Sequence, residues 1–212
     1  MDDVFRLIAA ERRATADLLD TLEEGQWATP SLCTEWTVQD VAAHLVMPFR
    51  LSTPALVVRM LRHRGSFDRV SEAFVREARD EDPASIVATL RANAEHRFTP
   101  PTLGPEAPLT DIVVHTLDMR LPLGAGPDPG RPQAVDVVLG FLVTPAATRG
   151  FVPRGRTAGL SFASSDTGWR HGQGPPVQGP GSSLALAITG RRAGLEDLEG
   201  DGVAELARRI AG

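Results

Sequence analysis

The chain has 212 residues, a formal net charge of -5 at neutral pH and a hydrophobic content of 42%. This is enough apolar material for one large or two small globular domains with a real core. An acidic chain without a basic stripe interleaved with aromatic residues is not expected to bind nucleic acid. No apolar run approaches the eighteen residues that a membrane span needs, and the N-terminus has the pattern of an amphipathic helix rather than of a signal peptide. We therefore expect a cytoplasmic protein with no membrane partner.

The first half of the chain shows the periodicity of amphipathic helices. Apolar residues recur at helical spacing over 3–22, with charged residues between them. Thr37 stands before the next apolar run with Asp40 three places on, which predicts a capping box and a helix start. Pro48 is expected to end or kink that helix. Three further helices are predicted over 53–63, 67–79 and 83–97, the last with Pro83 in its first turn.

The second half begins helical and then changes in texture. Thr110 has the character of an N-cap for a helix over 111–120, and another helix is predicted over 132–142. After Arg149, glycine and proline dominate, and Leu160, Phe162 and Ala163 alternate with polar residues as in a strand. We therefore predict an α+β protein, with a four-helix bundle over 1–148 and a small α+β C-terminal domain over 149–212.

Three residues could bind one metal ion. Asp111 and His115 are four apart on a predicted helix, so both side chains project from the same face. His44 lies on another helix, on the side of its apolar residues. The chain has a single cysteine, Cys33, which can form neither an internal disulfide nor a cysteine pair for zinc, so a metal must rely on histidine and carboxylate ligands. A buried, hydrogen-bonded His44 and an ordinary surface pair of Asp111 with His115 are the competing interpretation.

Three segments resemble the mycothiol-dependent maleylpyruvate isomerase family, a branch of the DinB-like metal-binding bundles. They are ERRATADLLDTLEEGQWATPSLCTEWTVQDVAAHLV at 11–46, APLTDIVVHTLDMRLPLG at 107–124, and SSDTGWRHGQGPPVQGPGSSLALAITGRRAGLEDLEGDGVAEL at 164–206. By this resemblance the family's metal ligands fall on His44, Asp111 and His115, the residues that the spacing also selects. The family characteristically has glutamate where this chain has Asp111, and the shorter side chain is expected to shift the ion or weaken its binding.

The resemblance also implies a chemistry. Three nitrogen and oxygen ligands leave a position open on a divalent ion, which is typical of catalytic zinc sites, although nickel, manganese and iron accept the same ligands. In the family, the thiol of mycothiol, a low-molecular-weight thiol of actinobacteria, adds across a cis double bond, permits rotation and leaves. We therefore expect a mycothiol-dependent isomerase or S-transferase acting on a small, electrophilic acid. Arg191 matches the place of a functional arginine that could hold a carboxylate or an enolate, with Arg192 as the neighbouring alternative.

Two other functions remain open, namely a metal-dependent hydrolase that uses bound water and a non-catalytic, metal-stabilised binding or stress protein. Asp118 is placed to orient His115, or to pair with Arg120 or with a neighbouring helix. We interpret Cys33 as an inert, buried small residue and the tryptophans as packing anchors. Three histidines are expected to be exposed and away from the metal: His63, His96 and His171. Either a monomer or a homodimer fits these features.

Overall fold

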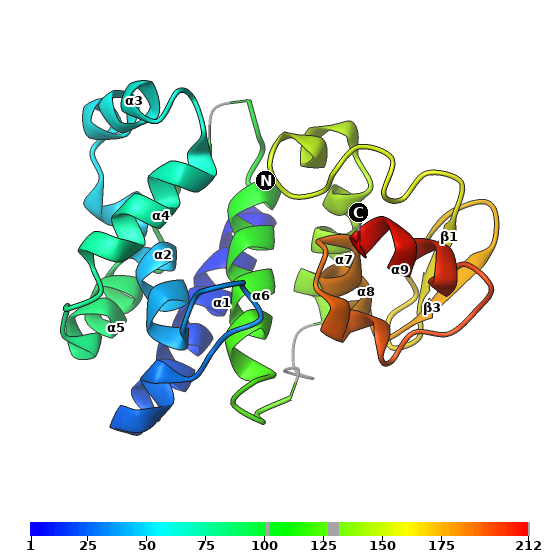
Figure 1. Cartoon of the computed structure of the whole chain (residues 1–212), viewed down its shortest axis with the longest axis horizontal. Helices are drawn as coiled ribbons and strands as arrows, with labels where there is room; N and C mark the ends of the chain where they lie inside the picture. The colour runs from blue at the N-terminus through cyan, green and yellow to red at the C-terminus, as the bar shows by residue number, and fades with distance from the viewer. Residues whose placement is uncertain (101, 127–131, 212) are drawn as a thin grey trace.

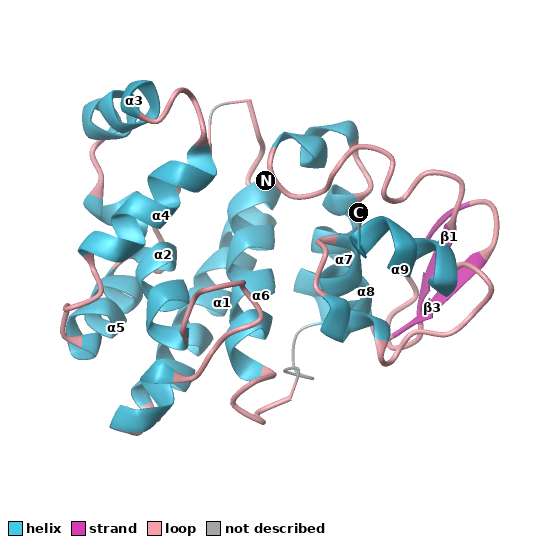
Figure 2. Ribbon diagram, in the orientation of Figure 1, coloured by secondary structure: helices cyan, strands magenta, loops and turns pink. Residues whose placement is uncertain are grey.

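The computed structural model describes residues 1–100, 102–126 and 132–211 (Figure 1). The first part of the chain is helical: α1 (Asp2–Asp20), the 3₁₀ turn η1 (Glu24–Ala28), α2 (Val38–Arg50), α3 (Thr53–Arg62), α4 (Phe67–Glu77), α5 (Pro83–Ala92) and α6 (Glu106–Arg120). It is followed by α7 (Pro132–Leu142), η2 (Pro145–Arg149), β1 (Ser161–Ser164), β2 (Arg170–Gly172), β3 (Pro176–Gly179), α8 (Gly181–Ile188), η3 (Arg192–Leu195) and α9 (Val203–Ala211). The predicted α+β class is confirmed, with the strands confined to the C-terminal part (Figure 2).

Four helices form a bundle that positions the site. Helix α1 packs against α5 and α6, and α2 packs against the same two helices. Helix α4 covers the outer side of α2, whereas α3 touches α4 and contributes no buried side chain. The buried apolar side of each bundle helix faces the shared core, as the predicted amphipathic pattern requires. Among the described residues, no helix combines the length and the apolarity needed to cross a bilayer.

The C-terminal part is a small mixed sheet with helices. Strand β1 lies in the centre, antiparallel to β2 with Phe162 opposite His171, and parallel to β3 with Phe162 opposite Val177. The fully buried helix α8 packs on this sheet and on α7, and α7 also packs on α6. Helix α7 thus contacts both parts of the molecule, and the division between 148 and 149 stays a prediction.

The start of α6 differs from the prediction. The helix begins at Glu106, so Thr110 lies inside it, fully buried, and its hydroxyl donates to the Glu106 carbonyl. Pro108 is compatible with a loop before the helix, but it occupies the first turn, where the backbone N–H groups have no intrahelical acceptor and proline is tolerated. The predicted N-cap at Thr110 is wrong, and the helix is longer at its N-terminal end.

Two other helix ends are instructive. The predicted capping box of Thr37 and Asp40 is confirmed, and α2 continues two residues past Pro48 to Arg50. Helix α5 ends at Ala92, earlier than predicted, and one Nη atom of Arg12 donates to the carbonyls of Asn93, Ala94 and His96 just beyond it. A buried guanidinium thus binds the carbonyls of the turn that follows the helix.

Candidate metal centre

Helices α2 and α6 bring the three sequence-predicted ligands together. His44 lies in the middle of α2, where residues 40–47 are all buried, and its ring is directed into the bundle toward α6. Asp111 and His115 occupy successive turns of α6, facing α2. The histidine rings meet edge to face with centroids 4.9 Å apart. His44, Asp111 and His115 therefore form a group that could hold a metal ion.

The distances within this group suit a shared cation better than hydrogen bonds. The Nε2 atoms of His44 and His115 lie 3.5 Å and 3.6 Å from the same Asp111 Oδ1 atom. Both separations exceed the usual hydrogen-bond range. Ligand atoms bound about 2.1 Å from one tetrahedral ion lie about 3.4 Å from one another, close to the observed spacing. The donor set of two nitrogens and one oxygen also matches catalytic zinc sites, so the residues fit the expected metal.

Charge and burial around the triad favour a cation. Burial by itself would raise the pKa of Asp111, but the facing His44, with His115 and Arg12, lowers it below the ordinary value. The carboxylate is therefore ionised at neutral pH. The buried Nδ1 atom of His44 has no hydrogen-bond partner among the described residues, and it is the Nε2 atom that faces Asp111. Asp111 retains 33% side-chain exposure against 7% for His44, so the group is reached from the Asp111 side.

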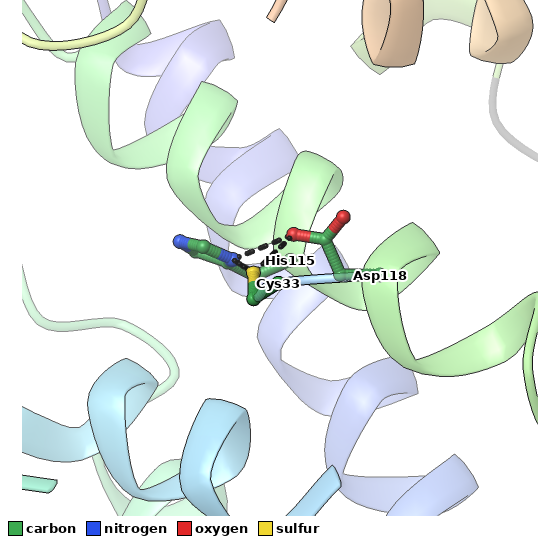
Figure 3. Close-up of side chains that lie close together, drawn as sticks. All are labelled: Cys33, His115 and Asp118. Carbon is green, nitrogen blue, oxygen red and sulfur yellow. Dashed lines mark hydrogen bonds and ion pairs between the residues drawn. The ribbon is translucent and has the colours of Figure 1, made fainter. Parts of the chain in front are cut away.

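The other ring nitrogen of His115 is held by Asp118. His115 Nδ1 lies 2.9 Å from Asp118 Oδ2, and the Cys33 thiol donates to the same oxygen at 3.0 Å (Figure 3). Arg191 donates from Nε to Oδ1 at 3.0 Å and from Nη2 to Oδ2 at 2.7 Å. Burial by itself would raise the pKa of Asp118, but the hydrogen bonds from His115 and Arg191 hold it well below its usual range. A fully buried carboxylate thus fixes the orientation of His115, as carboxylates do behind histidine ligands of metals.

A helix end places Arg191 beside Asp118. Helix α8 ends at Ile188, and Gly190 follows with a φ of 102°, a left-handed conformation that favours glycine. The Gly190 N–H donates to the Ala187 carbonyl and the Arg191 N–H to the Leu186 carbonyl, which is the Schellman arrangement. The glycine that stops α8 therefore also directs the next residue toward α6.

The loop that carries Cys33 is held against α6 by a backbone hydrogen bond to the Asp118 carbonyl. Pro122 stands four residues after Asp118 and has no N–H, so the Asp118 carbonyl cannot be paired within the helix. It accepts the Leu32 N–H at 3.0 Å instead, which holds the loop before α2 against α6. Burial, with the neighbouring Asp118 charge, raises the pKa of the Cys33 thiol to about 12. The thiol is protonated at neutral pH, as expected of an inert cysteine, but Cys33 is half-buried and lies beside the site instead of being buried in the core.

A second group of possible ligands, Cys33, His115 and Asp118, is less suited to a metal. The Arg191 guanidinium already binds both Asp118 oxygens, and its Nη2 atom lies 3.7 Å from the Cys33 sulfur. A metal there would have to displace a charged arginine that is largely buried with its carboxylate. Arg191 therefore takes the place of a cation in this group.

An open depression adjoins the triad, with a volume of about 680 Å³. Its walls are the loop over 30–37, residues 190–193 and Ile210. Trp36 and Cys33 line the depression and also contact the triad, since the Trp36 ring lies 5.4 Å from that of His44 and 6.5 Å from that of His115. A volume of this size accommodates a small organic molecule.

Several residues differ from their sequence interpretation. Trp36 packs against the core, as a packing anchor does, and it also lines the depression and contacts the His44 ring. Its position two residues before the helix that carries His44 was the sequence signal for this second role. Asp118 orients His115, which is one of its predicted roles, and its ion pair is with Arg191 and not with Arg120, which donates to the carbonyls of Gly126 and Ala125. Three histidines lie outside both ligand groups: His96 and His171 are exposed as predicted, and His63 is half-buried.

Comparison with known proteins identifies the family. The family model described as the mycothiol maleylpyruvate isomerase N-terminal domain matches residues 8–116, more than half of the chain, including all three residues of the triad. The chain belongs to this family. The resemblance predicted from the sequence is thereby confirmed. No curated protein matches the chain.

Two solved structures share the fold of this family member. One is the mycothiol-dependent maleylpyruvate isomerase, with a TM-score of 0.59 and 14% identity, covering 94% of this chain and 92% of that one. The other is a histidine-to-alanine mutant of that isomerase, with a TM-score of 0.59, 13% identity and the same coverage. At this identity the likeness establishes the fold of nearly the whole chain and not its activity.

Proposed function

We propose that this member of the mycothiol maleylpyruvate isomerase family is a metal-dependent enzyme that uses a low-molecular-weight thiol on a small, electrophilic acid. The observation that carries the proposal is the placement of two histidine Nε2 atoms 3.5 Å and 3.6 Å from one Asp111 oxygen. Family membership supports the choice of thiol, with mycothiol as the expected cofactor. A thiol bound to a divalent cation loses its proton at neutral pH, which is the chemistry that zinc or a similar ion supplies when bound.

The residues of the site have different proposed roles. His44, Asp111 and His115 would hold the ion, and a fourth position would stay free for the thiol because neither ligand group among the described residues adds a fourth side chain to this triad. Asp118 holds His115 Nδ1, so that Nε2 stays directed toward Asp111. Cys33 is not the proposed nucleophile, because its thiol donates to Asp118 and the attacking sulfur belongs to the cofactor.

Metal content tests the first part of the proposal. Purified protein is expected to bind one zinc or similar ion per chain, measured by inductively coupled plasma mass spectrometry after dialysis. His44→Ala and His115→Ala should each abolish binding, because each removes one of three ligands. His171→Ala is the matched control, since His171 is exposed on β2 and outside the triad. Full occupancy in both triad variants would contradict the metal site.

Thiol dependence tests the second part. The zinc-loaded protein is expected to isomerise or conjugate a cis-unsaturated acid such as maleylpyruvate only when mycothiol is added. Turnover of an ester or amide substrate without thiol would instead support the metal-dependent hydrolase. Stoichiometric zinc without either activity would support the non-catalytic, metal-stabilised protein.

A further inference from the structure

We propose that the depression beside the triad contains a carboxylate-binding subsite whose cation is Arg192, while the neighbouring Arg191 is a positioning residue. This inference rests on the proposed function for its biological meaning, but the binding it predicts does not require the metal. Both arginines line the depression. The structure distinguishes them by what their guanidinium groups already bind.

All three guanidinium nitrogens of Arg191 already donate hydrogen bonds within the protein. Nε and Nη2 bind the two oxygens of Asp118, and Nη1 donates to the Thr189 carbonyl at 3.1 Å. The side chain is only 20% exposed, and the carboxylate it binds is fully buried. A substrate carboxylate could engage the fork of Arg191 only by displacing Asp118, which would leave that carboxylate buried without its partner. Arg191 therefore acts on the site through Asp118 and His115.

Arg192 has the opposite surroundings. It begins η3, is exposed, and makes no side-chain hydrogen bond or ion pair within the described part of the chain. Its planar fork is thus free to bind a carboxylate through two parallel hydrogen bonds. The remaining walls include Leu32, Trp36 and Ile210, which suit the carbon skeleton of an organic acid.

The surrounding charges can be counted. Arg156 lies behind the wall at Gly190, since a Cβ atom built on this glycine would meet Arg156 Nη1 at 2.5 Å. Arg156 forms no ion pair with a described residue, and Arg191 and Asp118 neutralise each other. Glu35, which lines the depression, opposes an anion. Among the residues that form or back these walls, Arg156 and Arg192 against Glu35 leave one positive charge, whereas the Asp111 carboxylate belongs to the adjoining triad and not to the walls. A small anion is therefore favoured here over a cation.

Isothermal titration calorimetry with succinate tests the subsite, and succinamide serves as the neutral analogue of the same skeleton. Succinate has no electrophilic double bond, so binding is separated from reaction. The titrations use wild-type protein stripped of metal by a chelator and then dialysed, so that direct coordination of succinate by an ion does not contribute. The same titrations on zinc-loaded protein show whether the subsite persists beside the ion.

Arg192→Gln is expected to weaken succinate binding about tenfold, the effect of losing one charge-assisted contact. Arg192→Lys should weaken it less, because the charge remains and only the fork is lost. Glu35→Gln should strengthen binding by removing the opposing charge. Arg154→Gln is the matched control and should leave binding unchanged, since Arg154 is exposed, lies outside the depression and makes no ion pair with any residue that the structure describes.

Arg191→Gln should behave differently from Arg192→Gln, lowering zinc affinity and thermal stability through Asp118. The inference is overturned if wild-type protein fails to bind succinate, or if succinamide binds equally well. It is also overturned if Arg192→Gln matches Arg154→Gln, or if Glu35→Gln weakens binding. In each of these cases the proposed function still holds if zinc content and thiol-dependent turnover are normal. If the wild-type protein binds succinate but not zinc, only the proposed function is contradicted.

Discussion

Replacing Asp118 with asparagine tests the buried hydrogen-bond network in which Asp118 holds His115 and Arg191. Asp118 is 0% exposed and accepts hydrogen bonds from Cys33, from both arms of the Arg191 fork and from His115. Asparagine keeps the shape but removes the charge, and its NH₂ group cannot accept the second set of donors. Arg191, 20% exposed, would keep a largely buried charge without a counter-ion.

Breaking such a buried pair costs about 3 kcal/mol of unfolding free energy, at the lower end of the usual range because Arg191 retains some solvent contact. In a chain of this length, that loss lowers the thermal midpoint by about 6–12 °C. Zinc affinity should fall about 10–100-fold, because His115 loses the carboxylate that fixes its orientation. Differential scanning calorimetry gives the midpoint, and competition with a chromogenic chelator gives the zinc affinity.

Two controls distinguish the effect of breaking the buried Asp118 network from the effect of removing any one carboxylate. Asp17→Asn removes a carboxylate that pairs with Arg91 at the surface, where the side chain is 70% exposed, and should leave the midpoint nearly unchanged. The double variant Asp118→Leu with Arg191→Met removes both charges and should be less destabilised than Asp118→Asn alone. Wild-type stability and zinc affinity in Asp118→Asn would refute the reasoning.

Three other changes have defined outcomes. Cys33→Ala should cost about 1 kcal/mol and leave zinc content unchanged, since Asp118 keeps its other donors; loss of zinc would make the cysteine a ligand. Gly190→Ala should cost about 1–3 kcal/mol in denaturant unfolding, because φ is 102° and the new Cβ would approach Arg156; an unchanged midpoint would contradict the helix-end argument. Glu81→Gln should cost about 0.5 kcal/mol at pH 7. Burial by itself would raise the pKa of Glu81, but Arg50 and Ser85 lower it overall, so its contribution is present above the unfolded pKa and is lost as pH falls through the folded pKa. Urea titrations at pH 7 and below pH 3 check this, and a constant difference would exclude the ion pair as its source.

Features that depend on local spacing could be predicted from the amino-acid sequence. Apolar residues at helical intervals fixed most helix positions, and Thr37 with Asp40 fixed the start of α2, because capping depends on residues within one turn. The spacing of Asp111 and His115 placed both on one face of α6 for the same reason. Thr110 misled because an early proline is compatible with a loop or with a first helical turn, and only packing decides between them.

The way in which distant segments meet at the site depends on tertiary packing. Sequence spacing does not indicate that Cys33 and Arg191 both bind the buried Asp118 carboxylate, since Cys33 is 85 positions and Arg191 73 positions away from Asp118. That meeting depends on where α8 ends against α6, which follows from the packing of two hydrophobic surfaces. The different surroundings of Arg191 and Arg192 have the same origin: adjacent residues leave a Schellman turn in different directions, and one enters the protein while the other stays in solvent.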